Sequence, residues 1–134
     1  MNQVTSDSLL SIEKEYRCYN DIHKRLASYV IDEYDENLKL MSGSCIDIDC
    51  GLGDVTNNIL LPALGPKATV IGTDKSNRAI NYAKETYVNQ ARLKFEILNI
   101  ETKNLPKKYI SKFDHIFLFK ALDWSMDYKY IIIN

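Results

Sequence analysis

The stretch CIDIDCGLGDVT (residues 45–56) combines a short apolar run, a Gly-x-Gly turn and the start of a helix. It is followed by VIGTD (residues 70–74), a β-branched run that ends in an acid. A strand that enters a helix through a glycine turn brings backbone N–H groups close to a ligand, and a carboxylate at the end of the next strand can accept hydrogen bonds from ribose hydroxyls. The two stretches therefore predict a nucleotide-type cofactor site.

Strand-like and helix-like segments alternate around this motif. Apolar, β-branched or aromatic runs predict strands at 45–48, 68–73, 93–98 and 113–119. Strands separated by helices imply right-handed crossovers. The sequence therefore predicts an α/β fold, a mostly parallel sheet with helices on both faces.

Three stretches have the apolar spacing of helices. Residues 8–39 are expected to form two helices with a break near Asn20. A short helix is expected directly after the glycine turn, with its stop at Pro62 and Gly65 Pro66. The third helix is expected within 76–87, where Ser76 is the predicted N-cap.

Composition favours one intracellular domain. A chain of 134 residues can bury a sizeable core and falls short of the length at which a second domain is expected. Its net charge of −1, with both signs interspersed, offers no basic surface to nucleic acid or to an anionic membrane, so a small molecule is the expected partner. The odd number of cysteines (Cys18, Cys45 and Cys50) argues against a disulfide framework. Without a charged leader or an apolar run of membrane-spanning length, the sequence predicts a cytoplasmic location.

These spaced blocks resemble the first half of a class I S-adenosylmethionine-dependent methyltransferase and, more narrowly, the insect juvenile hormone acid methyltransferases. The resemblance spans residues 16–124. The residues that carry it are Tyr16, Asn20 to Arg25 with Ala27, Asp47 to Thr56, Gly72 to Asp74 with Ser76, Tyr82 and Ala83, Leu98 to Ile100, Leu105 and Pro106, and Phe113 to Phe117 with Phe119, Leu122 and Trp124.

The resemblance implies a Rossmann-like fold in a single, incomplete methyltransferase domain over 1–134. Its expected parts are an N-terminal helical cap at 1–40, a Rossmann-like core at 44–124 and a divergent tail at 125–134. Family members continue through three more strands, so the chain is expected to end after about the fourth parallel strand. That strand would then be an exposed edge, through which the chain could self-associate.

The resemblance also assigns the cofactor, S-adenosyl-L-methionine, to residues of this sequence. Asp47, Gly51 and Gly53 match the turn that holds the methionine part, and a glycine lacks the Cβ that would block backbone approach to a ligand. Asp74 matches the acid that binds the ribose hydroxyls, and Asn99 the position that accepts a hydrogen bond from the adenine amino group. The same cofactor set includes Asp49, Lys75 and Ile100.

For the substrate, the resemblance implies a small terpenoid carboxylic acid. His23 occupies a position that is usually glutamine, and Trp124 matches a tryptophan. The resemblance implies that the two together orient the carboxylate, through imidazole and indole N–H donors. A helix-borne histidine can equally be a surface or packed side chain, and a lone tryptophan a core aromatic. A carboxylate is already ionised at neutral pH, so the expected catalysis is alignment and exclusion of water, without a catalytic acid, base or metal.

Two acids depart from the family pattern. Asp49 replaces the first glycine of the turn, where aspartate tolerates a left-handed backbone but adds a negative charge. Asp123 stands where the juvenile hormone enzymes usually have a histidine, and would repel a carboxylate substrate. The alternative to an enzyme is therefore a non-catalytic fragment that at most binds the cofactor or pairs with a full-length relative. A nicotinamide dinucleotide module fits poorly, because Thr56 stands in place of the third glycine.

Overall fold

The structure is a computed structural model that describes residues 21–22 and 24–119. Predictions on His23, Asp123, Trp124, the break near Asn20 and the tail at 125–134 lie outside these residues.

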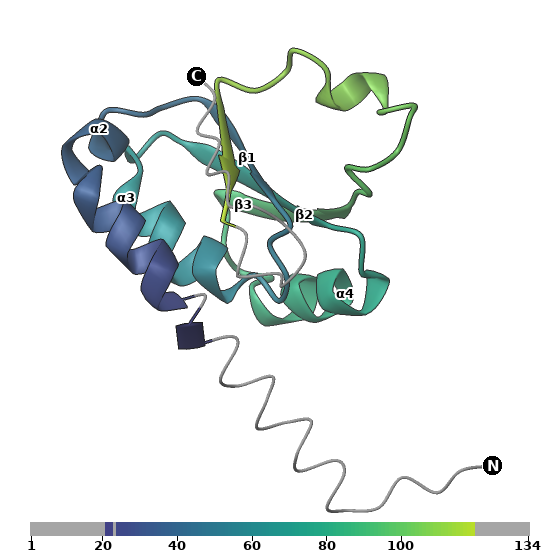
Figure 1. Cartoon of the computed structure of the whole chain (residues 1–134), viewed down its shortest axis with the longest axis horizontal. Coiled ribbons are helices and arrows are strands. Elements are labelled where there is room, and N and C mark those ends of the chain that lie inside the picture. The colour runs from purple at the N-terminus through teal and green to yellow at the C-terminus, as the bar shows by residue number, and fades with distance from the viewer. Residues whose placement is uncertain (1–20, 23, 120–134) are drawn as a thin grey trace, which may run out of the picture.

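A four-stranded parallel sheet forms the centre of the molecule (Figure 1). Its strands are β1 (Ser44–Ile48), β2 (Thr69–Asp74), β3 (Leu93–Ile97) and β4 (His115–Leu118), in the spatial order β3-β2-β1-β4. All neighbouring pairs are parallel, which confirms the predicted sheet and places the carboxyl ends of the strands along one edge.

Helical segments connect the strands. Helical residues at 24–33 precede α2 (Asp35–Lys39), with a turn at Tyr34 between them. The segment after the glycine turn contains a π-helix, η1 (Thr56–Leu60), that continues into α3 (Leu61–Ala63). After β2 comes α4 (Asn77–Thr86), and η2 (Lys107–Tyr109) is a short 3₁₀-helix before β4. None of the described helices has both the length and the apolar character needed to cross a membrane.

Two of the local predictions have clear outcomes. Ser76 is the N-cap of α4, because its hydroxyl oxygen accepts a hydrogen bond from the Ala79 N–H at 3.2 Å. Pro62 lies in the first turn of α3, and the helical residues end at Ala63, within the stop predicted at Pro62 and Gly65 Pro66. A proline is tolerated there because the first turn of a helix does not use its N–H.

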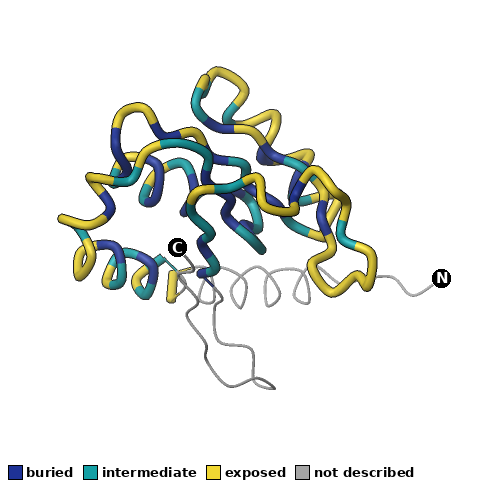
Figure 2. The backbone as a smooth tube through the Cα atoms, turned by 90° about the horizontal axis from the view of Figure 1, so that it is seen from above, coloured by how far each residue is buried: buried dark blue, intermediate teal, exposed yellow. Residues whose placement is uncertain are grey.

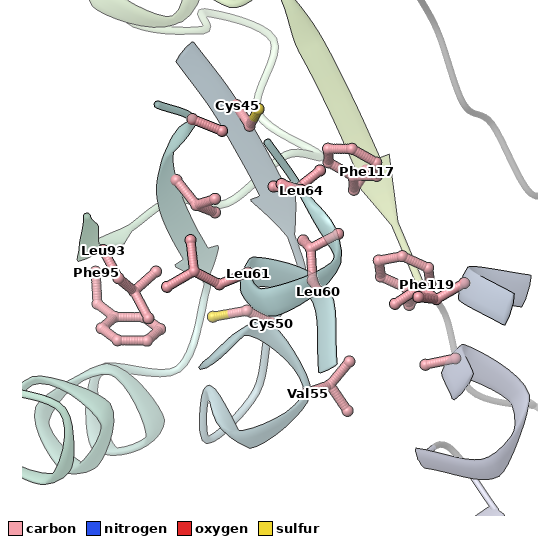
Figure 3. Packing of buried hydrophobic residues seen from close by; sticks show 14 of the residues in the cluster. Cys45, Cys50, Val55, Leu60, Leu61, Leu64, Leu93, Phe95, Phe117 and Phe119 are labelled. Atoms are coloured by element: carbon pink, nitrogen blue, oxygen red, sulfur yellow. The ribbon is translucent and has the colours of Figure 1, made fainter. Parts of the chain in front are cut away.

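The main core lies between one face of the sheet and the helices. Figure 2 shows buried residues along the strands and the inner sides of the helices, with exposed residues on the outer turns. In Figure 3, Leu60 and Leu61 of the segment after the glycine turn lie between Phe95 of β3 and Phe117 of β4. A smaller cluster on the other face joins Ile46 of β1 to Leu98 and Tyr109. The deeper core therefore forms under the segment that begins at the predicted cofactor turn.

Candidate functional site

The carboxyl ends of β1 and β2 are joined by hydrogen bonds at one edge of the sheet. The Cys50 N–H donates to the Thr73 carbonyl oxygen at 2.8 Å. The next amide, Gly51 N–H, donates to Asp74 Oδ2 at 3.0 Å, while Ser76 N–H donates to Asp74 Oδ1 at 2.8 Å. Both oxygens of the predicted ribose-binding acid are thus oriented by backbone donors from two different segments.

The turn after β1 uses left-handed backbone three times. The φ angles are 57° at Asp49, 59° at Gly51 and 85° at Gly53. Asp49 adopts the conformation for which the family pattern has glycine, and aspartate is one of the few other residues that adopt it readily. The left-handed backbone that the sequence analysis allows for aspartate is observed at this position.

The glycines near this edge have different surroundings. A Cβ on Gly51 would meet no atom within 4 Å, so open space adjoins the backbone there. A Cβ on Gly53 would lie 2.7 Å from the Phe95 ring and 3.1 Å from the Ala83 Cβ, and a Cβ on Gly72 would also lie 2.7 Å from that ring. Gly51 therefore leaves room beside the turn, whereas Gly53 and Gly72 make room for a core aromatic.

Asp47 is a buried acid beneath the turn. It belongs to β1, where it stands opposite Gly72 of β2 and Phe117 of β4, and only 2% of its surface is exposed. The Thr56 hydroxyl donates to its Oδ2 at 2.6 Å. Burial raises the pKa of Asp47 to about 7; the Thr56 hydrogen bond opposes this rise and the nearby charge of Asp49 adds to it.

Thr56 is the residue of this arrangement that the sequence analysis did not single out as a site residue. It is fully buried and begins the π-helix η1. Single turns of π-helix occur often at functional sites. Its position in the sequence could have indicated this role. A small hydroxyl residue one helical turn after the glycine turn can reach back with its side chain to the end of the preceding strand.

The remaining cofactor residues of the prediction lie at the same edge. Asn99 and Ile100 follow β3, whose end is held to β2 by the Leu98 N–H, which donates to the Asp74 carbonyl oxygen at 2.9 Å. Asn99 and Lys75 are exposed, and the Asn99 side-chain oxygen accepts a hydrogen bond from the Glu101 N–H at 3.0 Å. The structure therefore gathers all the predicted cofactor residues along the carboxyl edge of β1, β2 and β3.

Two cysteines of this part of the chain are buried and free: Cys45 near the start of β1 and Cys50 in the turn after it. Burial raises the pKa of the Cys45 thiol to about 11 and raises that of Cys50 further, with the charges of nearby acids adding to both shifts. Such thiols are protonated at neutral pH, so they are packing residues and not nucleophiles.

The helix over 24–33 also contacts this region. Lys24 Nζ lies 2.9 Å from Asp54 Oδ2, and Asp54 directly follows Gly53. The hydrogen bond and the charge of Asp54 raise the pKa of Lys24. The ion pair therefore links the helix over 24–33 to the segment that leaves the glycine turn.

Known proteins share both the sequence pattern and the fold. Residues 41–132 match the family model described as a methyltransferase domain. The chain is 27% identical over 117 residues to juvenile hormone acid O-methyltransferase of Drosophila melanogaster, a match that covers 85% of this chain and 39% of that protein. It is 31% identical over 116 residues to the Bombyx mori protein of the same name, covering 84% of this chain and 40% of that one.

The chain thus spans about two fifths of the length of these relatives. Among solved structures, the plantazolicin methyltransferase BpumL in complex with SAH has the same fold, with a TM-score of 0.55 and 24% identity over 84% of this chain and 41% of that one. The matched family model covers the sheet, the glycine turn and the acid at the end of β2 together. The chain therefore belongs to the methyltransferase domain family.

Proposed function

We propose that this chain binds S-adenosylmethionine and serves the O-methylation of a small carboxylic acid of the juvenile hormone type. The cofactor part is supported by the carboxyl edge of the sheet. The substrate part is supported by the names of the Drosophila and Bombyx relatives and by Trp124, which matches the family's tryptophan. His23 would act with it in place of the usual glutamine.

The observation that carries the cofactor proposal is the setting of Asp74. Its two oxygens each accept one backbone N–H, from Gly51 and from Ser76. An ionised carboxylate has about four acceptor sites, so these bonds fix its orientation and leave sites for two ribose hydroxyls. The open space beside Gly51 adjoins the same carboxylate, because the Gly51 amide is one of its donors. These residues fit the cofactor.

The chain's own residues would act by holding and aligning. When bound, the cofactor supplies an electrophilic methyl group on a sulfonium. Asp74 would hold the ribose, the Gly51 backbone would approach the methionine part, and Asn99 would lie toward the adenine. A carboxylate substrate needs no general base, because it is already ionised near neutral pH, so positioning accounts for the rate.

A second candidate, a cofactor-binding chain without catalysis, is favoured by one observation. Asp49 adds a negative charge close enough to raise the pKa values of both Asp47 and Cys50. An additional acid beside the methionine end opposes the approach of anionic groups, including a carboxylate substrate.

Isothermal titration with S-adenosylhomocysteine (SAH) tests the proposal. We expect saturable binding that weakens about 10- to 100-fold in Asp74→Ala, because hydrogen bonds to a charged group are lost. The matched control is Asp114→Ala, which removes a carboxylate that accepts the Ser44 N–H at 2.9 Å at the opposite edge of the sheet. The control should bind like wild type.

Transfer of a labelled methyl group to terpenoid acids then separates the two candidates. Binding with transfer supports the enzyme, and binding without transfer supports the non-catalytic chain. A folded wild-type chain that does not bind SAH, or one whose affinity is the same in Asp74→Ala, contradicts the proposal.

A further inference from the structure

The helix over 24–33 is seated on the main core by one face. Ala27 and Ile31 are buried in the cluster that also contains Leu60 and Phe119. Lys24 precedes them by one and two turns, at a spacing that places it on the same helix face. The ion pair with Asp54 is therefore made by the core-facing side of this helix.

The position of Asp54 gives this contact its importance. Asp54 lies between Gly53, with its left-handed backbone, and the η1 helix. The Asn57 N–H donates to the Gly53 carbonyl oxygen at 2.9 Å, and the Gly53 N–H to the Cys50 carbonyl oxygen at 3.1 Å. These hydrogen bonds join Gly53, the residue before Asp54, both to the turn and to the η1 helix.

The other ion pairs of residues 21–22 and 24–119 lie elsewhere. Lys39 and Asp35 pair within α2, with side chains 65% and 47% exposed. Lys108 pairs with Glu96 on the second face of the sheet. The Asp54 side chain is only 18% exposed, so its bond to Lys24 is less screened by water than the pair in α2.

We propose that Lys24 and Asp54 are a positioning pair that couples the N-terminal helix to the cofactor turn, so that the order of the turn, and with it cofactor affinity, depends on the seated helix. The affinity part rests on the proposed function. His23, the predicted substrate residue, directly precedes Lys24 in the sequence. The pair therefore connects the segment assigned to the substrate with the turn assigned to the cofactor.

Two measurements test this coupling, and the first needs no ligand. Amide hydrogen exchange is followed in the free chain at residues 51–57 and, for comparison, in β2 and β3. We expect Lys24→Met and Asp54→Asn to speed exchange in 51–57 about two- to fivefold without changing the strands. Lys24→Arg keeps the charge and should restore protection, and Lys39→Met, which breaks the exposed pair in α2, should leave it unchanged.

The second measurement is titration with SAH. Lys24→Met and Asp54→Asn should each weaken binding about two- to fivefold, with the double variant no weaker than either single variant. Unchanged exchange at 51–57 overturns the positioning pair whether or not SAH binds. If exchange responds as expected but wild type does not bind SAH, the coupling stands and the proposed cofactor function fails.

Discussion

The turns after β1 and β2 lie at the same edge of one sheet, but they use their acids differently. Asp47, near the end of β1, is buried under Thr56 and has a pKa raised to about 7. Asp74, which ends β2, is half-buried and accepts hydrogen bonds from two backbone amides. Both acids belong to the sequence motif. Only Asp74 is partly exposed and accepts backbone N–H groups, from Gly51 and Ser76. The comparison shows that one motif holds side by side a buried acid, Asp47, and a partly exposed acid, Asp74, which is the proposed ribose ligand.

The largest expected effect concerns the pH dependence of stability and the buried acid. The folded-state pKa of Asp47 lies above its ordinary value of 3.8, so between about pH 4 and pH 7 the folded chain holds a proton that the unfolded chain has lost. The free energy of unfolding therefore falls as pH rises through this window. Asp47→Asn should remove this fall, because an amide still accepts the Thr56 hydroxyl and carries no charge.

Urea unfolding of both chains across pH 4 to pH 8 measures the difference. The free energy of unfolding of the variant should rise relative to that of wild type as pH rises. The difference is at most about 4 kcal/mol, which corresponds to the whole shift of the Asp47 pKa. Parallel stability curves for the two chains would mean that Asp47 is not the buried acid described above.

The next effect distinguishes two glycines of the same turn: Gly53, which faces the core, and Gly51, which adjoins open space. Gly53→Ala should reduce the free energy of unfolding by about 3 kcal/mol, because the new Cβ meets Phe95 and the backbone is left-handed. Gly51→Ala, with open space around its Cβ, should cost only about 1 kcal/mol through its backbone and act mainly on SAH affinity. Chemical denaturation measures both. The double variant Gly53→Ala/Phe95→Leu, which has a smaller side chain at 95, should recover part of the lost free energy of unfolding. Equal losses in Gly53→Ala and Gly51→Ala would refute the distinction.

The smallest effect concerns Asp49, the extra acid in the turn after β1. Asp49→Gly should strengthen SAH binding about three- to tenfold, because it removes a negative charge from the predicted methionine end and glycine accepts φ 57°. Asp49→Asn keeps a side chain that tolerates this backbone and removes only the charge. Titration of the three chains separates the two causes: a gain in both variants indicates charge, and a gain in Asp49→Gly alone indicates bulk. No gain in either shows that Asp49 does not limit affinity.

The local elements were predictable because they follow from short-range patterns. The predicted strand at 45–48 is observed as Ser44–Ile48, and that at 93–98 as Leu93–Ile97, because alternation and β-branching act between near neighbours. The N-cap at Ser76 was predictable for the same reason. The predicted strand at 113–119 is shorter, His115–Leu118, since strand ends depend on the surrounding packing.

The sequence by itself determined the parallel α/β arrangement, the glycine turn and the acid at the end of the second strand, because spacing along the chain dictates these features. Only the tertiary structure decided what the individual residues do. It buries Asp47 against Thr56, makes Gly53 a neighbour of Phe95 and joins Lys24 to Asp54 across 30 positions of the chain. Such pairings depend on sheet register and on the packing of distant elements, and no local periodicity encodes them.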